Sequence, residues 1–378
     1  MLGGPDHQIQ YDIPIYSNQI KTKSIMGVQV VEIEEFLKLA KDYPILDVRS
    51  PGEYSHAHIP GAISFPLFSD EERAKIGTLY KQESREAAVR EGLDIFGPNM
   101  RRMTEQAEAI TSSQGAPQEK TLLIHCWRGG MRSGGVAWLL DLYGFKVFTL
   151  EGGYKVYRNW VLNMFEKRHL IRLVGGYTGS GKTSILQSLK KKGYQVIDLE
   201  ALASHKGSAF GNIGMPDQPT PEMFENLVAM ELYRQNSQNK EVWLEDESQR
   251  LGTVNIPNGL WQVMLQSSVS FVHVPFEKRL EHIVSEYGTL PKDRLVNAIT
   301  RISKKLGGLE AKNAITYLEE GKTAEAFSIL LKYYDKYYEK SLHKKPAWQQ
   351  SVSFIDCADT DADRNADTIL GHNAATVV

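Results

Sequence analysis

The chain has 378 residues, 42% of them hydrophobic and 24% charged, and its formal net charge is −2. This composition predicts a globular protein of two or three domains and excludes a polycation that holds nucleic acid by overall charge. The two cysteines, Cys126 and Cys357, lie far apart and indicate no disulfide framework. Because the sequence has no secretory leader pattern and no long apolar run, we expect a protein of the reducing cytoplasm, without a membrane span.

The first part of the chain alternates strand-like and helix-like segments. The expected elements are a strand passing into a helix over residues 27–40, an apolar strand within 43–54, a charged helical stretch over 69–110 interrupted at Gly97-Pro98, an exposed loop over 111–120, a buried strand over 121–125, a helix over 136–145 and a strand within 146–153. This order favours a parallel α/β sheet. We assign residues 1–153 to this first domain.

A second cycle begins at His169 with strand, glycine loop, helix and strand, the order of a nucleotide-binding βαβ unit. We therefore expect a linker helix over 154–168 and a second parallel-sheet domain over 169–360 with a helical carboxyl-terminal part. The polar segment 361–378 lacks aromatic residues and predicts a loosely ordered tail. The predicted fold class is α/β, with two parallel-sheet domains.

The loop "HCWRGGMRSG" places a cysteine and an arginine at C-x5-R spacing after the buried strand. Backbone N–H groups, the start of the next helix and two arginines would favour a thiolate and attract an anion. The candidate residues are Cys126, Arg128 and Arg132, with Trp127, Gly129, Gly130 and Met131 forming the rest of the loop. The spacing alone does not name a reaction, because cysteine phosphatases share it. A buried structural cysteine is the alternative.

The second domain carries "GYTGSGKT", which matches GxxxxGK[ST] between an apolar strand and a helix. Such a loop turns its backbone N–H groups toward phosphate oxygens at a helix amino terminus. Lys182 would neutralise the outer phosphates, and the Thr183 hydroxyl would help to hold Mg²⁺. The predicted phosphate-binding residues are Gly176, Gly179, Ser180, Gly181, Lys182 and Thr183.

Three acidic residues, Glu245, Asp246 and Glu247, follow the apolar run "VWL". We select Asp246 as the metal-side partner of Thr183, although the sequence does not separate the three. The loop "HKGSAFG" either contacts substrate or forms a turn, and its candidate residues are Gly207, Ser208, Phe210 and Gly211. Phe210 and Trp243 are also candidates for the wall of an apolar pocket, with core packing as the alternative.

The segment "LDVRSPGEYSHAHIPGAISFP" and the later "LEGGY" resemble the signatures of rhodanese domains. That resemblance implies a thiolate that carries sulfur or selenium. Combined with "HCWRGGMRSG", "GGYTGSGKT", "HKGSAFG" and "EDESQRLG", the chain resembles the bacterial tRNA 2-selenouridine synthases over about residues 28–356. One departure is His125, which stands where some members of the family carry a second cysteine.

The resemblance implies a tRNA with 2-thiouridine at the wobble position, whose sulfur is exchanged for selenium from selenophosphate. It also implies an S-geranylated intermediate made from geranyl diphosphate. The P-loop would then hold a diphosphate with Mg²⁺, and whether ATP binds is left open. Cys126 would hold or deliver selenium, while Arg128 and Arg132 would steer selenophosphate.

A local basic patch for tRNA is expected in "LLKYYDKYYEKSLHKK", where lysines recur every four residues. The candidate residues are Lys332, Lys336, Lys340 and Lys344, with Arg301 as a second position. The tyrosines between these lysines would pack inward or stack on unpaired bases. Two other functions remain open from the motifs alone: an ATP-dependent small-molecule kinase or sulfur-activating enzyme, and a sulfur carrier with a regulatory nucleotide switch.

Overall fold

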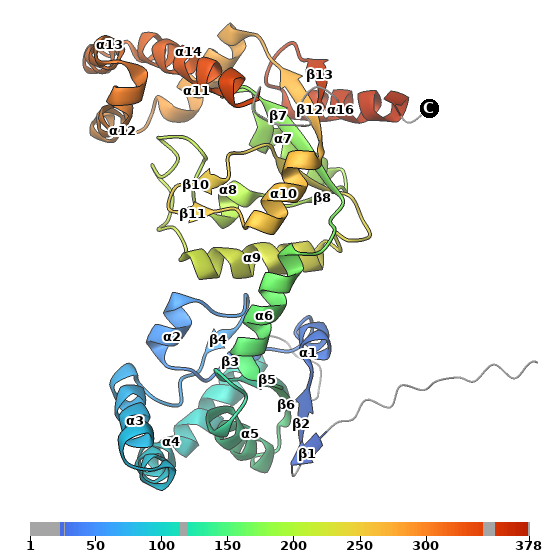
Figure 1. Cartoon of the computed structure of the whole chain (residues 1–378), viewed down its shortest axis with the longest axis vertical. Coiled ribbons are helices and arrows are strands. Elements are labelled where there is room, and N and C mark those ends of the chain that lie inside the picture. Colours follow the sequence, from blue (N-terminus) through green and yellow to red (C-terminus); the bar gives the residue numbers. More distant parts are fainter. Residues whose placement is uncertain (1–22, 26, 114–119, 343–351, 377–378) are drawn as a thin grey trace, which may run out of the picture.

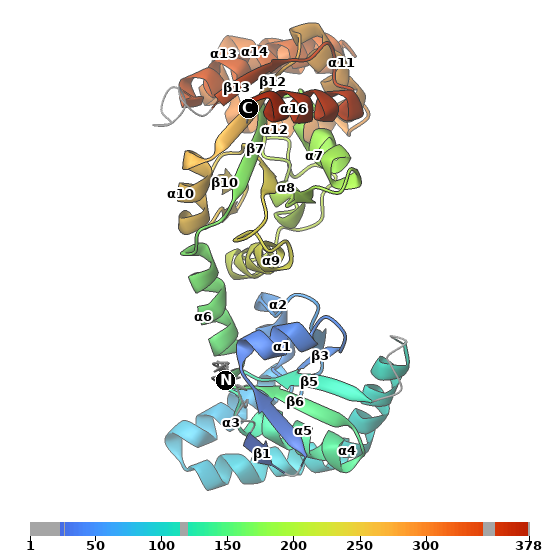
Figure 2. The same ribbon diagram turned by 90° about the vertical axis from the view of Figure 1, so that its right-hand side faces the viewer.

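The structure is a computed structural model that describes residues 23–25, 27–113, 120–342 and 352–376. Two α/β domains are stacked along the long axis of the molecule and joined by helix α6, Gly153–Phe165 (Figure 1). Figure 2 shows the same stack from the side, with the helical carboxyl-terminal part at the end far from the first domain. The predicted fold class is confirmed. Within the described residues, no helix is both long enough and apolar enough to span a membrane.

The first domain is built on a six-stranded sheet in the order β1-β2-β6-β5-β3-β4, in which only the β1–β2 pair is antiparallel. The strands are β1 (Lys23–Ile25), β2 (Val28–Val31), β3 (Ile45–Asp47), β4 (Ile63–Ser64), β5 (Thr121–His125) and β6 (Lys146–Leu150). The helices are α1 (Ile33–Leu39), α2 (Pro51–His56), α3 (Asp70–Gln82), α4 (Arg85–Ser113) and α5 (Met131–Leu142). Strand β5 is buried along its whole length.

The expected interruption at Gly97-Pro98 is wrong, because α4 continues through Pro98. The helical stretch instead breaks between α3 and α4, where the Ser84 hydroxyl accepts a hydrogen bond from the N–H of Ala87 at 3.0 Å. Ser84 therefore caps the new helix, a role in which serine competes well with helix continuation.

The second domain has a five-stranded, fully parallel sheet in the order β13-β12-β7-β9-β8. Its strands are β7 (Ile171–Gly176), β8 (Gln195–Val196), β9 (Val242–Glu245), β12 (Ser268–His273) and β13 (Val352–Asp356), with a separate ribbon of β10 (Arg250–Leu251) and β11 (Val254–Asn255). Its helices are α7 (Lys182–Lys191), α8 (Leu199–Leu202), α9 (Pro221–Arg234), α10 (Asn258–Gln266), α11 (Phe276–Tyr287), α12 (Lys292–Leu306), α13 (Gly308–Glu319), α14 (Thr323–Leu342) and α16 (Ala362–Thr376).

The expected loosely ordered tail is also wrong, because residues 362–376 form α16, which packs on α7. Ala366 and Ile369 are fully buried there, and Lys192 at the end of α7 pairs with Asp367 at 2.8 Å. Two apolar residues three positions apart are enough to give a helix one buried face, even in a segment that is polar overall.

Helix α6 takes the place of the expected linker helix over 154–168, but it is more than a linker. Its side chains Tyr157 and Trp160 belong to one buried cluster that includes Phe36 of the first domain and Phe224 of α9. Arg158 also pairs with Glu225 of α9 at 2.6 Å. Apolar packing and an ion pair therefore hold the second domain against α6.

Candidate active sites

The thiol loop, residues 126–132, begins at the carboxyl end of β5. Cys126 is only 3% exposed, and its Sγ lies 3.2 Å from the Ser133 hydroxyl. Burial would raise the pKa of Cys126, but hydrogen bonds from the Ser133 side chain and from the backbone N–H groups of Ser133, Gly130 and Arg128 lower it below the usual value. This arrangement favours a thiolate, the nucleophilic form of cysteine.

Two glycines allow the loop to lie directly on the "LEGGY" segment. Gly129 has φ +62°, and a Cβ there would lie 2.7 Å from the Leu150 carbonyl oxygen. Gly153 also has φ +62°, and a Cβ there would collide with the carbonyl oxygen of Cys126. That carbonyl accepts a hydrogen bond from the Tyr154 N–H at 2.8 Å. The rhodanese-like closing signature therefore fixes the backbone of the thiol loop.

The two loop arginines behave differently from one another. Arg132 donates to the Glu53 carboxylate at 2.7 Å, and Arg73 lies 3.7 Å from the same carboxylate. Arg128 is exposed at the rim. Hydrogen bonds, one of them from the Arg128 backbone N–H, lower the pKa of Cys126, and Glu53 offsets the charge of Arg132. That the two guanidinium groups also favour the thiolate stays a prediction.

Asp47 and Arg49 of the upstream signature form a buried ion pair beneath this loop. The Arg49 Nε donates to Asp47 at 2.9 Å, Arg49 also donates to the Ala57 carbonyl at 2.8 Å, and its guanidinium lies 3.8 Å from the Tyr154 ring centre. Because strands β3 and β5 are parallel neighbours that pair Asp47 with His125, this ion pair lies at the same sheet edge as the thiol. These residues support the site rather than face a substrate.

His125 packs against Phe36 and Tyr154, and its Nε2 lies 3.7 Å from Asp47. Burial lowers the pKa of His125 to about 4, although Asp47 acts in the opposite direction. The imidazole is therefore neutral near pH 7. His125 contacts Phe36 and Tyr154 of one buried cluster, whereas Cys126 belongs to another, as alternation of side chains along a strand requires.

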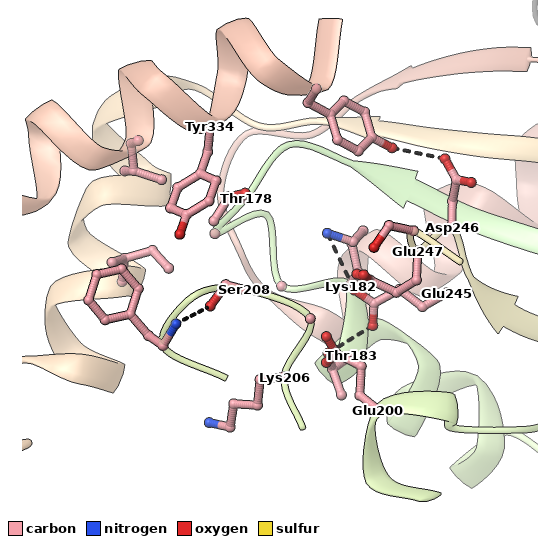
Figure 3. A pocket seen from close by; sticks show the side chains of 18 of the residues that line it. Thr178, Lys182, Thr183, Glu200, Lys206, Ser208, Glu245, Asp246, Glu247 and Tyr334 are labelled. Carbon is pink, nitrogen blue, oxygen red and sulfur yellow. Dashed lines mark hydrogen bonds and ion pairs between the residues drawn. The ribbon is translucent and has the colours of Figure 1, made fainter. Parts of the chain in front are cut away.

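The P-loop lies between β7 and α7, as predicted (Figure 3). Gly179 and Gly181 have φ values of +84° and +76°, which only glycine adopts readily. Lys182 Nζ is 3.3 Å from Glu245, and the Thr183 hydroxyl donates to the same carboxylate at 3.0 Å. Of the six predicted residues, Gly176 and Ser180 support the loop, and the other four line the cavity described below.

The carboxylates of Glu200, Glu245 and Glu247 face the P-loop, with one oxygen of each within 4.8 Å of the others. Burial raises the pKa of Glu200 and of Glu247, and repulsion by Glu245 raises both further. A divalent cation prefers such oxygen ligands and would relieve the repulsion. Glu200 was not predicted as a site residue, although its place just after the second strand of the βαβ unit was an available signal.

The selection of Asp246 as the metal-side residue is corrected. Asp246 instead accepts a hydrogen bond from the Tyr338 hydroxyl at 2.9 Å. Figure 3 shows its side chain directed away from Thr183, toward this tyrosine. Side chains alternate at the end of a strand, so Glu245 and Glu247 share the P-loop side and Asp246 takes the other.

A cavity of about 820 Å³ extends from the P-loop to an apolar end built by α11 and α14. The residues of the apolar end are Phe210, Ile283, Tyr287, Phe327, Leu330 and Leu331. Lys206, Gly207 and Ser208 of the "HKGSAFG" loop line it as well, while Gly211 packs on His205. The close-up in Figure 3 shows Lys182 and Thr183 at the charged end and Tyr334 toward the helices.

Trp243 is 2% exposed and belongs to the buried cluster that also contains Leu186 of α7, so core packing is the correct interpretation of this residue. Arg279, which the sequence analysis missed, donates to the Thr178 carbonyl at 3.0 Å and to Asp335 of α14 at 2.9 Å. It therefore ties the P-loop to the helices of the apolar end.

The candidate RNA-contacting residues divide into three groups. Lys332 and Lys336 are exposed on α14; the side chain of Lys340 and the whole of Lys344 lie outside the described part. Arg301 is exposed on α12, but it donates to the Ala209 carbonyl at 3.2 Å and so also supports the substrate loop. Among the tyrosines, Tyr338 packs inward and Tyr337 is exposed.

Comparisons with known proteins identify both parts of the chain. Residues 169–357 match the model of the tRNA 2-selenouridine synthase AAA domain, and residues 32–159 match that of the rhodanese-like domain. A tRNA 2-selenouridine synthase of Nitrosomonas eutropha is 32% identical over 75% of this chain and 81% of its own. Those of Bdellovibrio bacteriovorus and Shewanella piezotolerans are 34% and 32% identical, over 81% and 85% of this chain and 90% and 94% of their own. The chain therefore belongs to the tRNA 2-selenouridine synthase family.

Proposed function

We propose that this protein converts wobble 2-thiouridine in tRNA to 2-selenouridine with selenophosphate, through an S-geranylated intermediate made from geranyl diphosphate. The observation that carries the proposal is the single cavity that joins a P-loop to an apolar end. A prenyl diphosphate has the same division, with an anionic head and a hydrocarbon tail.

The charged end suits a diphosphate. Backbone N–H groups of the loop and the Lys182 ammonium would bind its oxygens. The Lys182 side chain is largely buried, and although burial alone would lower its pKa, the surrounding carboxylates raise the pKa above its usual value. Lys182 therefore stays cationic. When bound by Thr183, Glu200, Glu245 and Glu247, Mg²⁺ would supply further stabilisation of negative charge on the leaving group.

In the first step, the sulfur on C2 of the thiouridine attacks C1 of the geranyl group. The C1–O bond breaks, pyrophosphate leaves, and the N3 proton of the base passes to solvent. The P-loop N–H groups and Lys182 stabilise the negative charge that develops on the departing pyrophosphate. The apolar walls hold the tail and exclude water, which would otherwise capture the geranyl group.

In the second step, selenium bonds to C2, the C2–S bond breaks and geranylthiolate leaves to become geranylthiol. To release the selenium, the Cys126 thiolate, supported by its lowered pKa, attacks the phosphorus of selenophosphate; an S–P bond forms, the Se–P bond breaks, and the selenide that leaves attacks C2. Water then cleaves the S–P bond, which returns the Cys126 thiol and gives inorganic phosphate. Arg128, exposed at the rim, attracts the anionic selenophosphate, and Arg132 adds to this attraction despite its pairing with Glu53.

Two variants test the division of labour by mass spectrometry of 2-thiouridine tRNA. Lys182→Ala should lose geranyl transfer at least about a hundredfold, because it removes the cation that faces the leaving group. Cys126→Ser should still geranylate tRNA and incorporate no selenium. In a second stage, tRNA that the Cys126→Ser variant has geranylated is given to the Lys182→Ala variant. The Lys182→Ala variant should convert this tRNA to the selenouridine form.

Undiminished geranyl transfer by Lys182→Ala would contradict the role of the P-loop. Loss of both activities in a folded Cys126→Ser variant would contradict the separation of the two steps. ATP turnover in the absence of tRNA, without geranyl transfer, would favour a small-molecule kinase instead.

A further inference from the structure

The rim of the thiol loop exposes more apolar surface than a structural turn requires. Trp127 is 38% exposed and Met131 is 54% exposed, whereas Cys126, directly before Trp127 in the chain, is 3% exposed. Arg128 is also exposed at this rim. In the loop, the buried thiol is followed by an indole, a cation and a thioether. Such an arrangement fits a flat, partly apolar ligand that has anionic groups beside it.

The backbone and ring of Trp127 are held in place by contacts with Tyr154 and Lys155 on one side. Its carbonyl accepts a hydrogen bond from the Lys155 N–H at 3.0 Å, and its ring lies 5.7 Å from the Tyr154 ring at an angle of 38°. Tyr154 is itself buried, and its hydroxyl donates to Glu222 of α9 at 2.8 Å. The indole is thus supported by a rigid aromatic residue while a large part of it stays open to solvent.

An aromatic side chain fixed on one side and open on the other is suited to stacking on an unstacked base. The charge of the rim agrees with an RNA. Arg73 and Arg132 both pair with the Glu53 carboxylate, at 3.7 and 2.7 Å, and Asp70 also acts on Arg73, whereas Arg128 is exposed in the thiol loop itself. Arg128 is therefore the rim cation that suits a neighbouring phosphate.

We propose that Trp127 is a substrate-positioning residue on which the unstacked target pyrimidine of the tRNA stacks at the thiol loop. This inference rests on the proposed function, since it names the residue that presents the S-geranylated base to Cys126. Stacking against Trp127 lays the flat ring across the rim, and Arg128 binds a neighbouring phosphate. The base is thereby held beside the thiol by contacts that do not depend on the identity of the neighbouring bases.

The test compares Trp127→Ala, Trp127→Phe and Trp138→Ala in the full-length protein. Trp138 is the matched control, because it is 40% exposed on α5 of the same domain. Selenation of pre-geranylated tRNA is measured as a function of tRNA concentration. Trp127→Ala should raise the KM for tRNA by about tenfold or more, the usual effect of removing one stacking contact. Trp127→Phe should restore most of the loss, and Trp138→Ala should leave the KM unchanged.

Alkylation of Cys126 by iodoacetamide, measured without tRNA, separates positioning from damage to the loop. An unchanged alkylation rate in Trp127→Ala together with the raised KM supports the inference. The inference is overturned if Trp127→Ala leaves the KM for tRNA unchanged. It is also overturned if Trp127→Ala changes both the KM and the alkylation rate of Cys126.

Photocrosslinking keeps this inference separate from the proposed function. Irradiated 2-thiouridine tRNA should crosslink to the peptide that contains Trp127 in the wild type, and the crosslink should be lost in Trp127→Ala. If the wild type made no selenouridine, the proposed function would fail, yet this crosslink would still support a base-stacking site. A crosslink that maps only to other segments would overturn the site itself.

Discussion

Cys126 and Cys357 are both buried, yet their surroundings move their thiol pKa values in opposite directions. At Cys357, burial raises the pKa to about 11, and the negative charges of Asp356 and Asp359 add to this effect. At Cys126, burial also acts to raise the pKa, but hydrogen bonds from Ser133 and from the loop backbone lower it overall. Local hydrogen bonding, more than exposure, therefore decides which thiol is reactive.

Ser133→Ala should raise the pKa of Cys126 by roughly one unit, because it removes one hydrogen bond to a charged sulfur. The measurement is the rate of alkylation by iodoacetamide as a function of pH, with the modified peptide identified by mass spectrometry. Cys357 is an internal control, since it should stay unmodified at pH 7 in both proteins. An unchanged pH midpoint in Ser133→Ala would show that the backbone N–H groups alone set the thiolate population.

At the scale of elements, the P-loop helix α7 is covered on its outer side by α16. Leu186 and Leu189 of α7 are fully buried in the same cluster as Ala366 and Ile369 of α16. The helix that begins with Lys182 and Thr183 is thus held in place by a segment nearly two hundred positions later in the chain. The carboxyl-terminal helix therefore supports the phosphate site.

Ile369→Ala should lower the free energy of unfolding of the second domain by about 2–4 kcal/mol, because it leaves a cavity against α7. Thr368→Ala is the matched control on the exposed face of the same helix and should change this free energy by no more than about 0.5 kcal/mol. Urea unfolding followed by circular dichroism measures both. Equal effects of the two substitutions would mean that α16 does not pack on α7 in solution.

At the scale of the whole molecule, the two candidate sites open in different domains. Every residue that lines the cavity lies between Thr178 and Tyr338, whereas the thiol loop belongs to the first domain. The amino end of β7 follows α6, and its carboxyl end carries the P-loop toward α11 and α14 (Figure 1). A tRNA that uses both sites must therefore present its wobble base at two places.

Helix α12 has a basic face that suits the RNA backbone, because Arg294, Lys304 and Lys305 are all exposed on it. Arg294→Glu, Lys304→Glu and Lys305→Glu together should weaken tRNA binding at least about tenfold and flatten the dependence of log Kd on log salt by about two units. Arg301 is left unchanged because it also holds the Ala209 carbonyl. Filter binding at several salt concentrations measures both quantities.

The matched control reverses three exposed lysines of the first domain, Lys38, Lys41 and Lys81. It carries the same change in net charge and should alter tRNA affinity far less. Equal weakening by the two triple variants would indicate attraction by net charge alone and would contradict an RNA contact at α12.

Both loops could be predicted from the sequence alone, because each is a contiguous run whose glycines, cationic residues and flanking strand lie next to one another in the chain. Thus the C-x5-R loop lies after β5, and GxxxxGKT lies between β7 and α7, as predicted. The distant side chains that complete each site became clear only from the packing of the folded chain. Glu200 reaches Thr183 from another element, Glu53 offsets Arg132 across 79 positions, and strand alternation selects Glu245 over Asp246. These pairings depend on how separate elements pack, and hydrophobic packing leaves no local pattern that records them.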